Sequence, residues 1–352
     1  MGNPASDDST AILKTMVQRL FEDHAPSWER HDAPAWPADT WSAIDEMGLP
    51  LALLSEVAGG FGLAAADALS IVGIGAGVAM PLPLGEAMLA SWTLAEAGIA
   101  LPEGAVTIAP SGGTMALIEN EARFTVRGVA PRVPFARHVE WVLVPVADRG
   151  ATTVVLLSTQ GAVHTQGENL AGEARDDLAV DVAIDPAWIG RRGEGDPIQW
   201  RAHGAILRCQ AMAGAAERVM AMTVQYARER IQFGKSLGSF QAIQHNLAVA
   251  AGHVVAARGS ADMAAAAFGE GDIIPIAVAK ARCGEAAGAI ATIAHQVHGA
   301  LGFTQEYALQ RYTRRLWAWR EEYGAEAEWQ MLIGRAAADA PTGLWPFLTR
   351  LS

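Results

Sequence analysis

Residues 228–248 read RERIQFGKSLGSFQAIQHNLA and join two Ala-rich segments of helical spacing. Gly234 directly after Phe233 is typical of the end of a helix, and Ser239 is a residue type that caps the start of the next one. The turn therefore puts the Arg230 guanidinium beside a helix N-terminus, where free N–H groups and the positive end of the helix dipole favour a diphosphate. Spacing alone also allows a surface ion pair for Arg230 and core packing for Phe233.

A second informative stretch is HQVHGALGF, residues 295–303. Gly299 and Gly302 allow the backbone to turn and to approach a ligand after a helix, although the same glycines also suit a plain helix C-cap. His295 and His298 are three residues apart, but no third His, Cys or carboxylate is spaced to complete a metal site with them. We therefore predict no metal.

The two stretches together resemble the signature of the acyl-CoA dehydrogenase flavoprotein family, in which RxQFG is followed by FQxxQ and later by QxxGGxG[YF]. Ala300 replaces the usual second glycine of the last motif. The resemblance implies that FAD is the cofactor and that its ADP part is bound mainly by a neighbouring subunit. The positions that inherit cofactor contacts are Arg230, Gln232, Phe233, Gln241, Gln296 and Gly299.

The type and spacing of the apolar residues change twice along the 352 residues of the chain. Ala- and Leu-rich helical spacing gives way to short β-branched runs separated by Gly, Pro and Asp, and then returns. We predict a mainly α fold with a middle β domain: an N-terminal helical domain over 1–104, a small, shortened β barrel over 105–190, and a C-terminal four-helix bundle over 191–352. The four bundle helices are expected at 202–233, 240–268, 274–298 and 305–338.

The composition limits the cellular compartment and the classes of partner that we expect for the chain. A formal net charge of -12 argues against nucleic acid, because phosphate binding needs clustered Lys and Arg. Two cysteines without metal or disulfide spacing fit a reducing compartment, and the N-terminus lacks the pattern of a secretory signal. The longest apolar run, Ala68 to Met80, is too short to cross a bilayer. We expect a cytoplasmic protein without membrane contact.

Catalysis in the family requires a carboxylate that removes the α-proton of the acyl thioester. The resemblance puts Tyr323 at the usual place of this base and Gly204 at the place used by a minority of relatives. Neither is a carboxylate. Glu322 is the best remaining candidate for a catalytic base, Glu321 and Glu326 are weaker ones, and all three are also compatible with surface carboxylates.

The middle domain departs from the family as well. Of the Ser/Thr-Glu-Pro-x-x-Gly-Ser-Asp segment only Pro110 and Ser111 remain, and the Trp-Ile-Thr that packs on the flavin ring in relatives is replaced near Val133 to Phe135. The resemblance thus implies an intact half-site for ADP and an altered site for the flavin ring.

Two hypotheses follow for an FAD-dependent acyl-CoA dehydrogenase. The chain is either a divergent homo-oligomer with a displaced base, or the non-catalytic, FAD-sharing subunit of a heteromer like those that oxidise steroid side-chain CoA thioesters. The alternative is another flavin-dependent oxidase or monooxygenase of the same fold. The resemblance implies an acyl-CoA substrate, an electron-transfer flavoprotein as electron acceptor, and a dimer or tetramer that shares FAD across an interface.

Overall fold

The computed structural model describes residues 4–29, 35–121, 123–148, 151–191, 197–341 and 343–349. The chain divides into two compact units. Unit 1 comprises Met1–Leu69 and Met80–Gly204, and unit 2 comprises Ser70–Ala79 and Ala205–Ser352. The predicted division into three domains stays a prediction. Among the helices of the described ranges, none combines the length and hydropathy that crossing a membrane requires.

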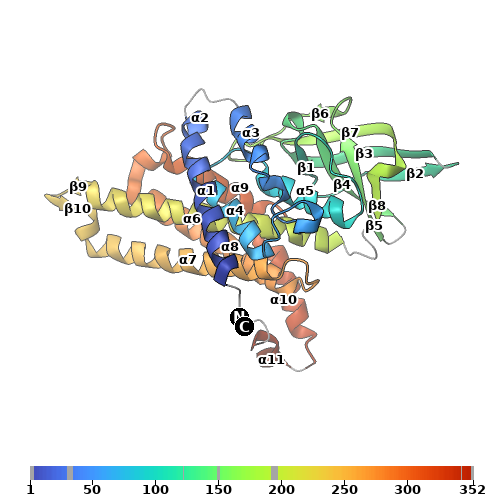
Figure 1. The fold of residues 1–352 in the computed structure, drawn as a ribbon. Helices are drawn as coiled ribbons and strands as arrows, with labels where there is room; N and C mark the ends of the chain where they lie inside the picture. Colours follow the sequence, from blue (N-terminus) through green and yellow to red (C-terminus); the bar gives the residue numbers. More distant parts are fainter. Residues whose placement is uncertain are drawn as a thin grey trace. The chain divides into compact units, whose positions relative to one another are not determined.

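Helices form the first part of unit 1, as the Ala- and Leu-rich pattern predicts (Figure 1). The helix α5 is buried along almost its whole length, which explains why its sequence is apolar on all sides. Gly48, with φ of 72°, and Gly59, with φ of 85°, supply left-handed backbone at turns between these elements. The elements are α1 (Pro4–His24), α2 (Pro26–Glu29), α3 (Ala38–Glu46), η1 (Leu49–Leu51), η2 (Glu56–Ala58), α4 (Ala65–Gly77), of which the residues from Ser70 onward belong to unit 2, and α5 (Leu84–Glu96).

The β part of unit 1 consists of two four-stranded sheets. One has the strand order β1-β4-β5-β8 and the other β2-β3-β7-β6. The pair β1 and β4 is parallel, and the remaining pairs within these sheets are antiparallel. The strands are β1 (Val106–Ile108), β2 (Ala116–Asn120), β3 (Arg123–Pro134), β4 (Trp141–Asp148), β5 (Ala151–Ser158), β6 (Val163–Thr165), β7 (Arg175–Ile184) and β8 (Ile189–Arg191), with η3 (Ala136–His138) and η4 (Pro186–Trp188) between them.

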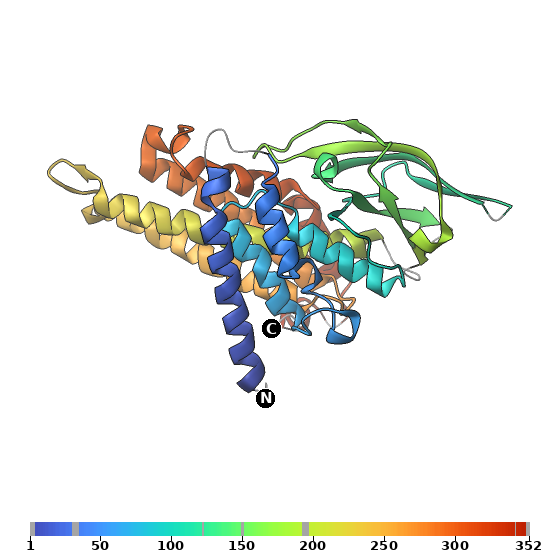
Figure 2. The ribbon, with the colours of Figure 1, turned by 45° about the horizontal axis from the view of Figure 1, so that its top comes forward.

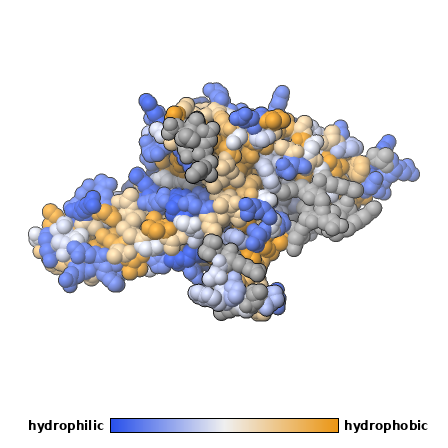
Figure 3. Space-filling model, turned by 60° about the horizontal axis from the view of Figure 1, so that its bottom comes forward, coloured by the Kyte–Doolittle hydropathy of each residue, from blue (hydrophilic) through white to orange (hydrophobic). Residues whose placement is uncertain are grey.

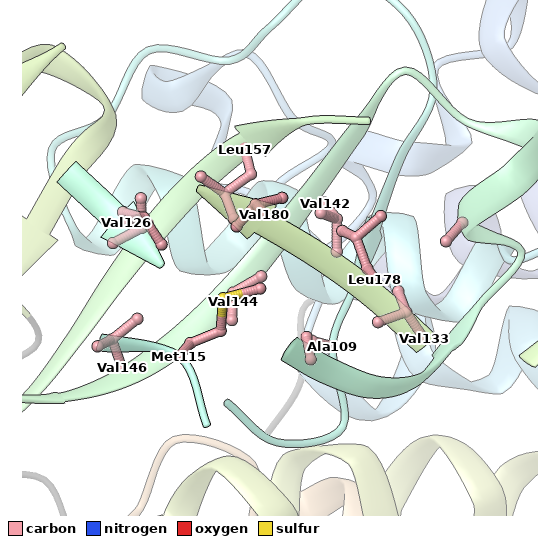
Figure 4. Packing of buried hydrophobic residues seen from close by; sticks show 13 residues of the cluster. Ala109, Met115, Val126, Val133, Val142, Val144, Val146, Leu157, Leu178 and Val180 are labelled. Atoms are coloured by element: carbon pink, nitrogen blue, oxygen red, sulfur yellow. The ribbon is translucent and has the colours of Figure 1, made fainter. Parts of the chain in front are cut away.

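Both sheets contribute side chains to one apolar core (Figure 4). Val142 and Val144 of β4 meet Val126 of β3 and Leu178 of β7 in this cluster, and Figure 2 shows the strands of the two sheets facing one another. Leu143, on the opposite face of β4, is also fully buried, which accounts for a continuous apolar run rather than an alternating one. The predicted β domain is therefore present, as two facing sheets rather than a single closed one.

Unit 2 is built from long Ala-rich helices. The fourth predicted helix, 305–338, is wrong as a single element: it is split into α9 and α10, because Tyr323 and Gly324 have φ values of 57° and 100° that no helix continues through. The helices are α6 (Pro197–Glu229), α7 (Gln241–Ala266), α8 (Ile274–His298), η6 (Gly299–Phe303), α9 (Leu309–Glu321), α10 (Glu326–Ala338) and α11 (Leu344–Thr349).

Two glycines allow α4 and α6 to cross at backbone distance inside unit 2. A Cβ on Gly214 would lie 2.0 Å from the carbonyl oxygen of Gly73, which no real contact tolerates. Beside this crossing, Arg258 of α7 donates to Gln210 and Glu217 of α6. The part of α4 that belongs to unit 2 is therefore fixed against the C-terminal helices by close packing.

Candidate functional site

The end of α6 carries the first group of candidate residues on a short hairpin. The predicted helix through Phe233 stops earlier, at Glu229, and Ile231–Gln232 (β9) pairs with Lys235–Ser236 (β10). Phe233 and Gly234 form the turn with φ values of 51° and 79°. Phe233 is 91% exposed, and Figure 3 shows hydrophobic residues at the surface of this projecting end of unit 2, among hydrophilic ones.

The N-terminus of α7 is open. The expected cap by Ser239 is wrong, because its hydroxyl donates to the Ser236 carbonyl at 2.7 Å and Phe240 takes the N-cap position without a side-chain cap. Gln241 is exposed at the first helical position, and Gln244 donates to the Gly238 carbonyl at 2.9 Å. The first amides of α7, a helix of 26 residues, therefore remain available to an anion.

The second group lies where α8 ends at His298. Gly299 has a φ of 62° and nothing within 4 Å of the place of a Cβ, so it faces open space. Gln296, one turn earlier, is exposed, whereas Gly302 is buried where η6 folds back. A polar side chain and an open stretch of backbone thus stand next to each other at this loop.

Tyr226 connects the two groups. Its ring stacks on His298 at 4.4 Å, its hydroxyl lies 3.5 Å from the His298 carbonyl, and its own carbonyl accepts from the backbone N–H of Arg230. The structure therefore brings the end of α6 and the end of α8 together. Arg230 is exposed and Gln232 half-buried, so the donors on this side of unit 2 can be reached by a ligand.

This donor set fits the ADP part of a dinucleotide. A guanidinium and an uncapped helix N-terminus match a diphosphate. Glutamine amides and an open glycine backbone suit the adenosine side, where neutral hydrogen bonds are needed. Apart from the half-buried Gln232, the side chains that would surround the ligand are solvent-exposed in the single chain, so this half-site is open rather than enclosed.

The candidate base positions lie at the turn between α9 and α10. Glu322, 11% exposed, accepts from Arg208 Nε at 2.6 Å, and the same guanidinium lies 5.4 Å from the Tyr323 ring. Glu322 is thus a counter-charge to a buried guanidinium. Of the weaker candidates, Glu321 is 64% exposed and Glu326 binds Arg320 at 2.8 Å. Gly204 lies buried within α6.

Lys280 fixes this turn from α8. Its ammonium group donates to the carbonyls of Arg320 and Gly324 at 2.7 and 2.8 Å, one on each side of the break. Burial lowers the pKa of Lys280. Trp329 Nε1 donates to the Tyr323 carbonyl at 3.1 Å. The backbone of Tyr323 is thus held by contacts from α8 and α10.

The segment expected to replace the flavin-packing residues is directed into unit 1. Val133 is fully buried in the core between the two sheets, and Phe135, 5% exposed, packs with Trp36 and Trp41. The Arg175 guanidinium lies 5.7 Å from the Phe135 ring. Both side chains are therefore occupied by packing within their own unit.

The stretch VAKARCGEAA indicates a structural rather than a catalytic role for Lys280, whereas Arg208 and Tyr226 were missed as organising residues. A signal for Lys280 exists: Ile276, Ala277, Cys283 and Gly284 flank it at i±3 and i±4, so it stands on an apolar stripe where a lysine needs buried acceptors. Arg208 stands similarly among apolar neighbours on α6. No pattern in the sequence predicts the stacking of Tyr226 on His298.

Comparison with known proteins gives consistent matches. Residues 200–337 match the family described as acyl-CoA dehydrogenase, C-terminal domain. The acyl-CoA dehydrogenase IpdE2 of Mycolicibacterium smegmatis is 24% identical over 312 residues, 86% of this chain and 91% of that protein. A chain of the ChsE4-ChsE5 complex from Mycobacterium tuberculosis has a TM-score of 0.84 at 21% identity, covering 97% of this chain and 99% of that one. A chain of the Tcur3481-Tcur3483 steroid ACAD has a TM-score of 0.82 at 21% identity, covering 95% and 99%. These two structural matches establish the fold.

Proposed function

Because the chain belongs to the acyl-CoA dehydrogenase family of oxidoreductases, we propose that it takes part in the FAD-dependent α,β-dehydrogenation of an acyl-CoA thioester. In this proposal it is the non-catalytic, FAD-sharing subunit of a heteromer. A second acyl-CoA dehydrogenase chain supplies the base and the surroundings of the flavin ring. We refer to this heteromer as the assembly.

One contrast carries the proposal. The ADP motifs are retained except for Ala300 and are largely exposed, with Phe233 at 91%, whereas the position of the base holds a buried Tyr323 next to a Glu322 that is paired with Arg208. The replacement segment around Phe135 is packed inside unit 1 as well. A chain that keeps the residues of the ADP motifs and lacks a free catalytic base suits a subunit that supplies only part of a shared cofactor site.

The residues of this chain would act by binding and orientation. Arg230 and the first amides of α7 would hold the diphosphate, together with Gln232 and Gln241. Gln296 and Gly299 would contact the adenosine side. When bound, FAD supplies the hydride acceptor for the β-carbon of the substrate. Phe233 would pack against the partner chain and exclude water from the shared cofactor.

Partner and substrate class extend the same proposal. One similar structure is named as a complex of two proteins and another as a steroid ACAD. For this chain we propose a bulky, non-linear acyl-CoA as the substrate of the assembly and an electron-transfer flavoprotein as the electron acceptor. A homo-oligomer with Glu322 as a displaced base, and a flavin-dependent oxidase or monooxygenase, are the competing hypotheses.

The test is to purify the chain alone and together with the acyl-CoA dehydrogenase homologue encoded nearest to it. We expect the lone chain to be colourless, and the pair to show flavin absorbance that is bleached anaerobically by acyl-CoA. A yellow lone chain that oxidises acyl-CoA would contradict the subunit role and favour the homo-oligomer. A flavoprotein that acyl-CoA does not reduce without oxygen would favour the oxidase or monooxygenase.

A further inference from the structure

His298, the last residue of α8, contacts two tyrosine rings that also contact each other. Tyr226 of α6 stacks on it at 4.4 Å with an interplanar angle of 25°, and Tyr307, which follows η6, lies 5.2 Å away. Its Nδ1 is 2.8 Å from the Ala294 carbonyl. A carbonyl only accepts, so Nδ1 carries a proton, and in the neutral ring Nε2 does not. Nε2 is buried and has no hydrogen-bond partner within the described residues.

His295, one turn earlier on α8, has a matching arrangement. Phe303 of η6 stacks on it at 4.1 Å, and Trp317 of α9 at 5.4 Å with an interplanar angle of 13°. Its Nε2 lies 2.9 Å from Thr313 Oγ1, while its Nδ1 is buried and makes no hydrogen bond to the part of the chain that is described. Each ring is therefore in contact with two aromatic rings and has one nitrogen within hydrogen-bond distance of a partner.

Gly302 brings the following loop down onto both histidines. A Cβ on Gly302 would lie 3.1 Å from His298 Cβ and 3.2 Å from His295 Nδ1. At Gly302 the loop thus packs against the His298 side chain and the His295 ring with less room than a Cβ needs. A displacement of the His295 ring would therefore act on the loop at Gly302 and at Phe303, which stacks on that ring.

We propose that His295 and His298 are positioning residues for the loop from Gln296 to Phe303, which keeps its nucleotide-holding shape only while both imidazoles are neutral. The inference rests on the proposed function, in which Gln296 and Gly299 contact the cofactor. It adds a pH-dependent control of that contact.

The physical reason is the lack of acceptors around the second nitrogen. A second proton would put a buried N–H beside aromatic rings, where an unsatisfied polar group is unfavourable and a charged one more so. The groups that face His298 are Tyr226 from α6 and Tyr307 after η6, and Glu229 acts electrostatically on Tyr307. The groups that face His295 are Phe303 from η6 and Trp317 and Thr313 from α9. The two histidines also act on each other.

The titration of both rings supports this geometry. Burial lowers the pKa of His298, which the hydrogen bond to Ala294 only partly offsets. Burial also lowers the pKa of His295, and the neighbouring His298 lowers it further. The folded loop therefore resists protonation, and acid strong enough to charge the rings opens it instead.

The experiment uses variants that keep one hydrogen bond and cannot be charged. In His298→Asn the amide nitrogen takes the place of Nδ1 toward the Ala294 carbonyl, and in His295→Gln it takes the place of Nε2 toward Thr313. His253→Asn is the matched control, since His253 lies on α7 and bonds Arg282 outside the loop. FAD release from the assembly is followed by flavin fluorescence between about pH 7.5 and about pH 5.5.

We expect the wild-type assembly and the His253→Asn control to lose at least about tenfold in FAD affinity over this range. The double variant His295→Gln/His298→Asn should stay within about threefold of its own affinity at the higher pH. The inference is overturned if wild-type affinity does not change with pH, or if the double variant declines as the wild type does. A double variant that binds FAD equally poorly at both pH values also overturns it, because the rings would then be merely structural.

A measurement without cofactor separates this inference from the proposed function. Hydrogen–deuterium exchange of peptides covering residues 296–308, corrected for the intrinsic pH dependence of exchange, should show acid-induced opening in wild type and none in the double variant. If no assembly binds FAD at the higher pH, the proposed function fails, and this exchange result alone decides the inference. Identical loop exchange at both pH values in wild type would overturn it.

Discussion

Arg208 Nε and Glu322 Oε2 are 2.6 Å apart in an ion pair whose side chains are 5% and 11% exposed. The same guanidinium lies over the Tyr323 ring, so one arginine on α6 contacts both residues of the turn that holds the candidate base positions. An ion pair this deeply buried is strongly coupled, so removing the charge of one partner weakens the compensation of the other charge.

Glu322→Gln is therefore expected to lower the free energy of unfolding by about 3 kcal/mol. Urea denaturation followed by circular dichroism measures this. Glu321→Gln is the matched control, because Glu321 is 64% exposed and its contact with Arg320 is 3.7 Å long, so its loss should change stability by less than about 0.5 kcal/mol. Equal stabilities for the two variants would contradict a structural role of the buried pair.

The same variant separates the two roles of Glu322. A counter-charge role predicts that the folded assembly containing Glu322→Gln keeps acyl-CoA oxidation within about threefold of wild type, whereas loss of a general base lowers kcat by about 10²-fold or more. Steady-state kinetics at a temperature below the variant's unfolding transition distinguish them. A large loss of kcat in a folded variant would restore Glu322 as the base.

The fold was predictable where periodicity is strong. The change from helical spacing to β-branched runs located the strands from Val106 to Arg191, and the Ala-rich segments located α7 and α8. The break at Tyr323 was not predictable, because a tyrosine with φ of 57° is set by tertiary contacts from Lys280 and Trp329 rather than by local preference. The end of α6 was misplaced because Phe233, an apolar residue, stands exposed on a turn.

The candidate site was predictable as a set of motifs but not as a geometry. RxQFG and the glycines after His298 mark two loops, and Tyr226 shows why they meet. What the sequence could not reveal is that Glu322 is already paired, since Arg208 lies 114 residues away along the chain. Long-range ion pairs leave no local pattern.

Arg230→Met is expected to weaken FAD binding to the assembly by about 30-fold, the equivalent of about 2 kcal/mol for a charge-assisted hydrogen bond. Isothermal titration with FAD measures the loss. Arg228→Met removes an equally exposed charge two residues earlier, in the last turn of α6, and should leave affinity within about twofold. Similar losses in both variants would indicate a general electrostatic effect and not a contact.

Acid should destabilise the folded chain in two steps. The pKa values of His138, His295 and His298 lie below 6.5, because burial disfavours the charged ring. Below pH 6.5 the unfolded chain binds these protons and the folded chain does not, so the free energy of unfolding decreases as the pH falls from that value toward the folded pKa values.

The second step involves Asp176. Although its burial acts in the opposite direction, hydrogen bonds from Arg137 and Gly167 lower its pKa below 3.8, so the stability it provides is present above that value and is lost at lower pH. Urea midpoints measured across the pH range check both steps. The double variant His295→Gln/His298→Asn should lose less stability than wild type in the first step and the same amount in the second. A wild-type urea midpoint that stays constant from about pH 7.5 to about pH 5 would contradict the assignment of the first step to these histidines.

Phe233→Gly tests whether the hairpin serves the single chain or the assembly. Phe233 and its neighbour Gly234 both have left-handed φ values, at 51° and 79°. Such a conformation costs a residue with a side chain about 1 kcal/mol, and glycine relieves it. At 91% exposure Phe233 gains little in return, apart from an edge contact with Phe240 at 6.3 Å between ring centroids. The isolated variant should thus be as stable as wild type or more stable by up to about 1 kcal/mol.

Association should respond in the opposite direction. An exposed aromatic side chain held in a strained conformation suits an interface anchor, and its removal should weaken formation of the assembly by about tenfold or more. Sedimentation velocity with the partner chain and the flavin content of the purified complex measure this. Val57→Ala, which truncates another fully exposed apolar side chain, is the control and should alter neither property. A Phe233→Gly chain that is less stable alone, yet assembles normally, would mean that Phe233 supports its own hairpin and not a partner.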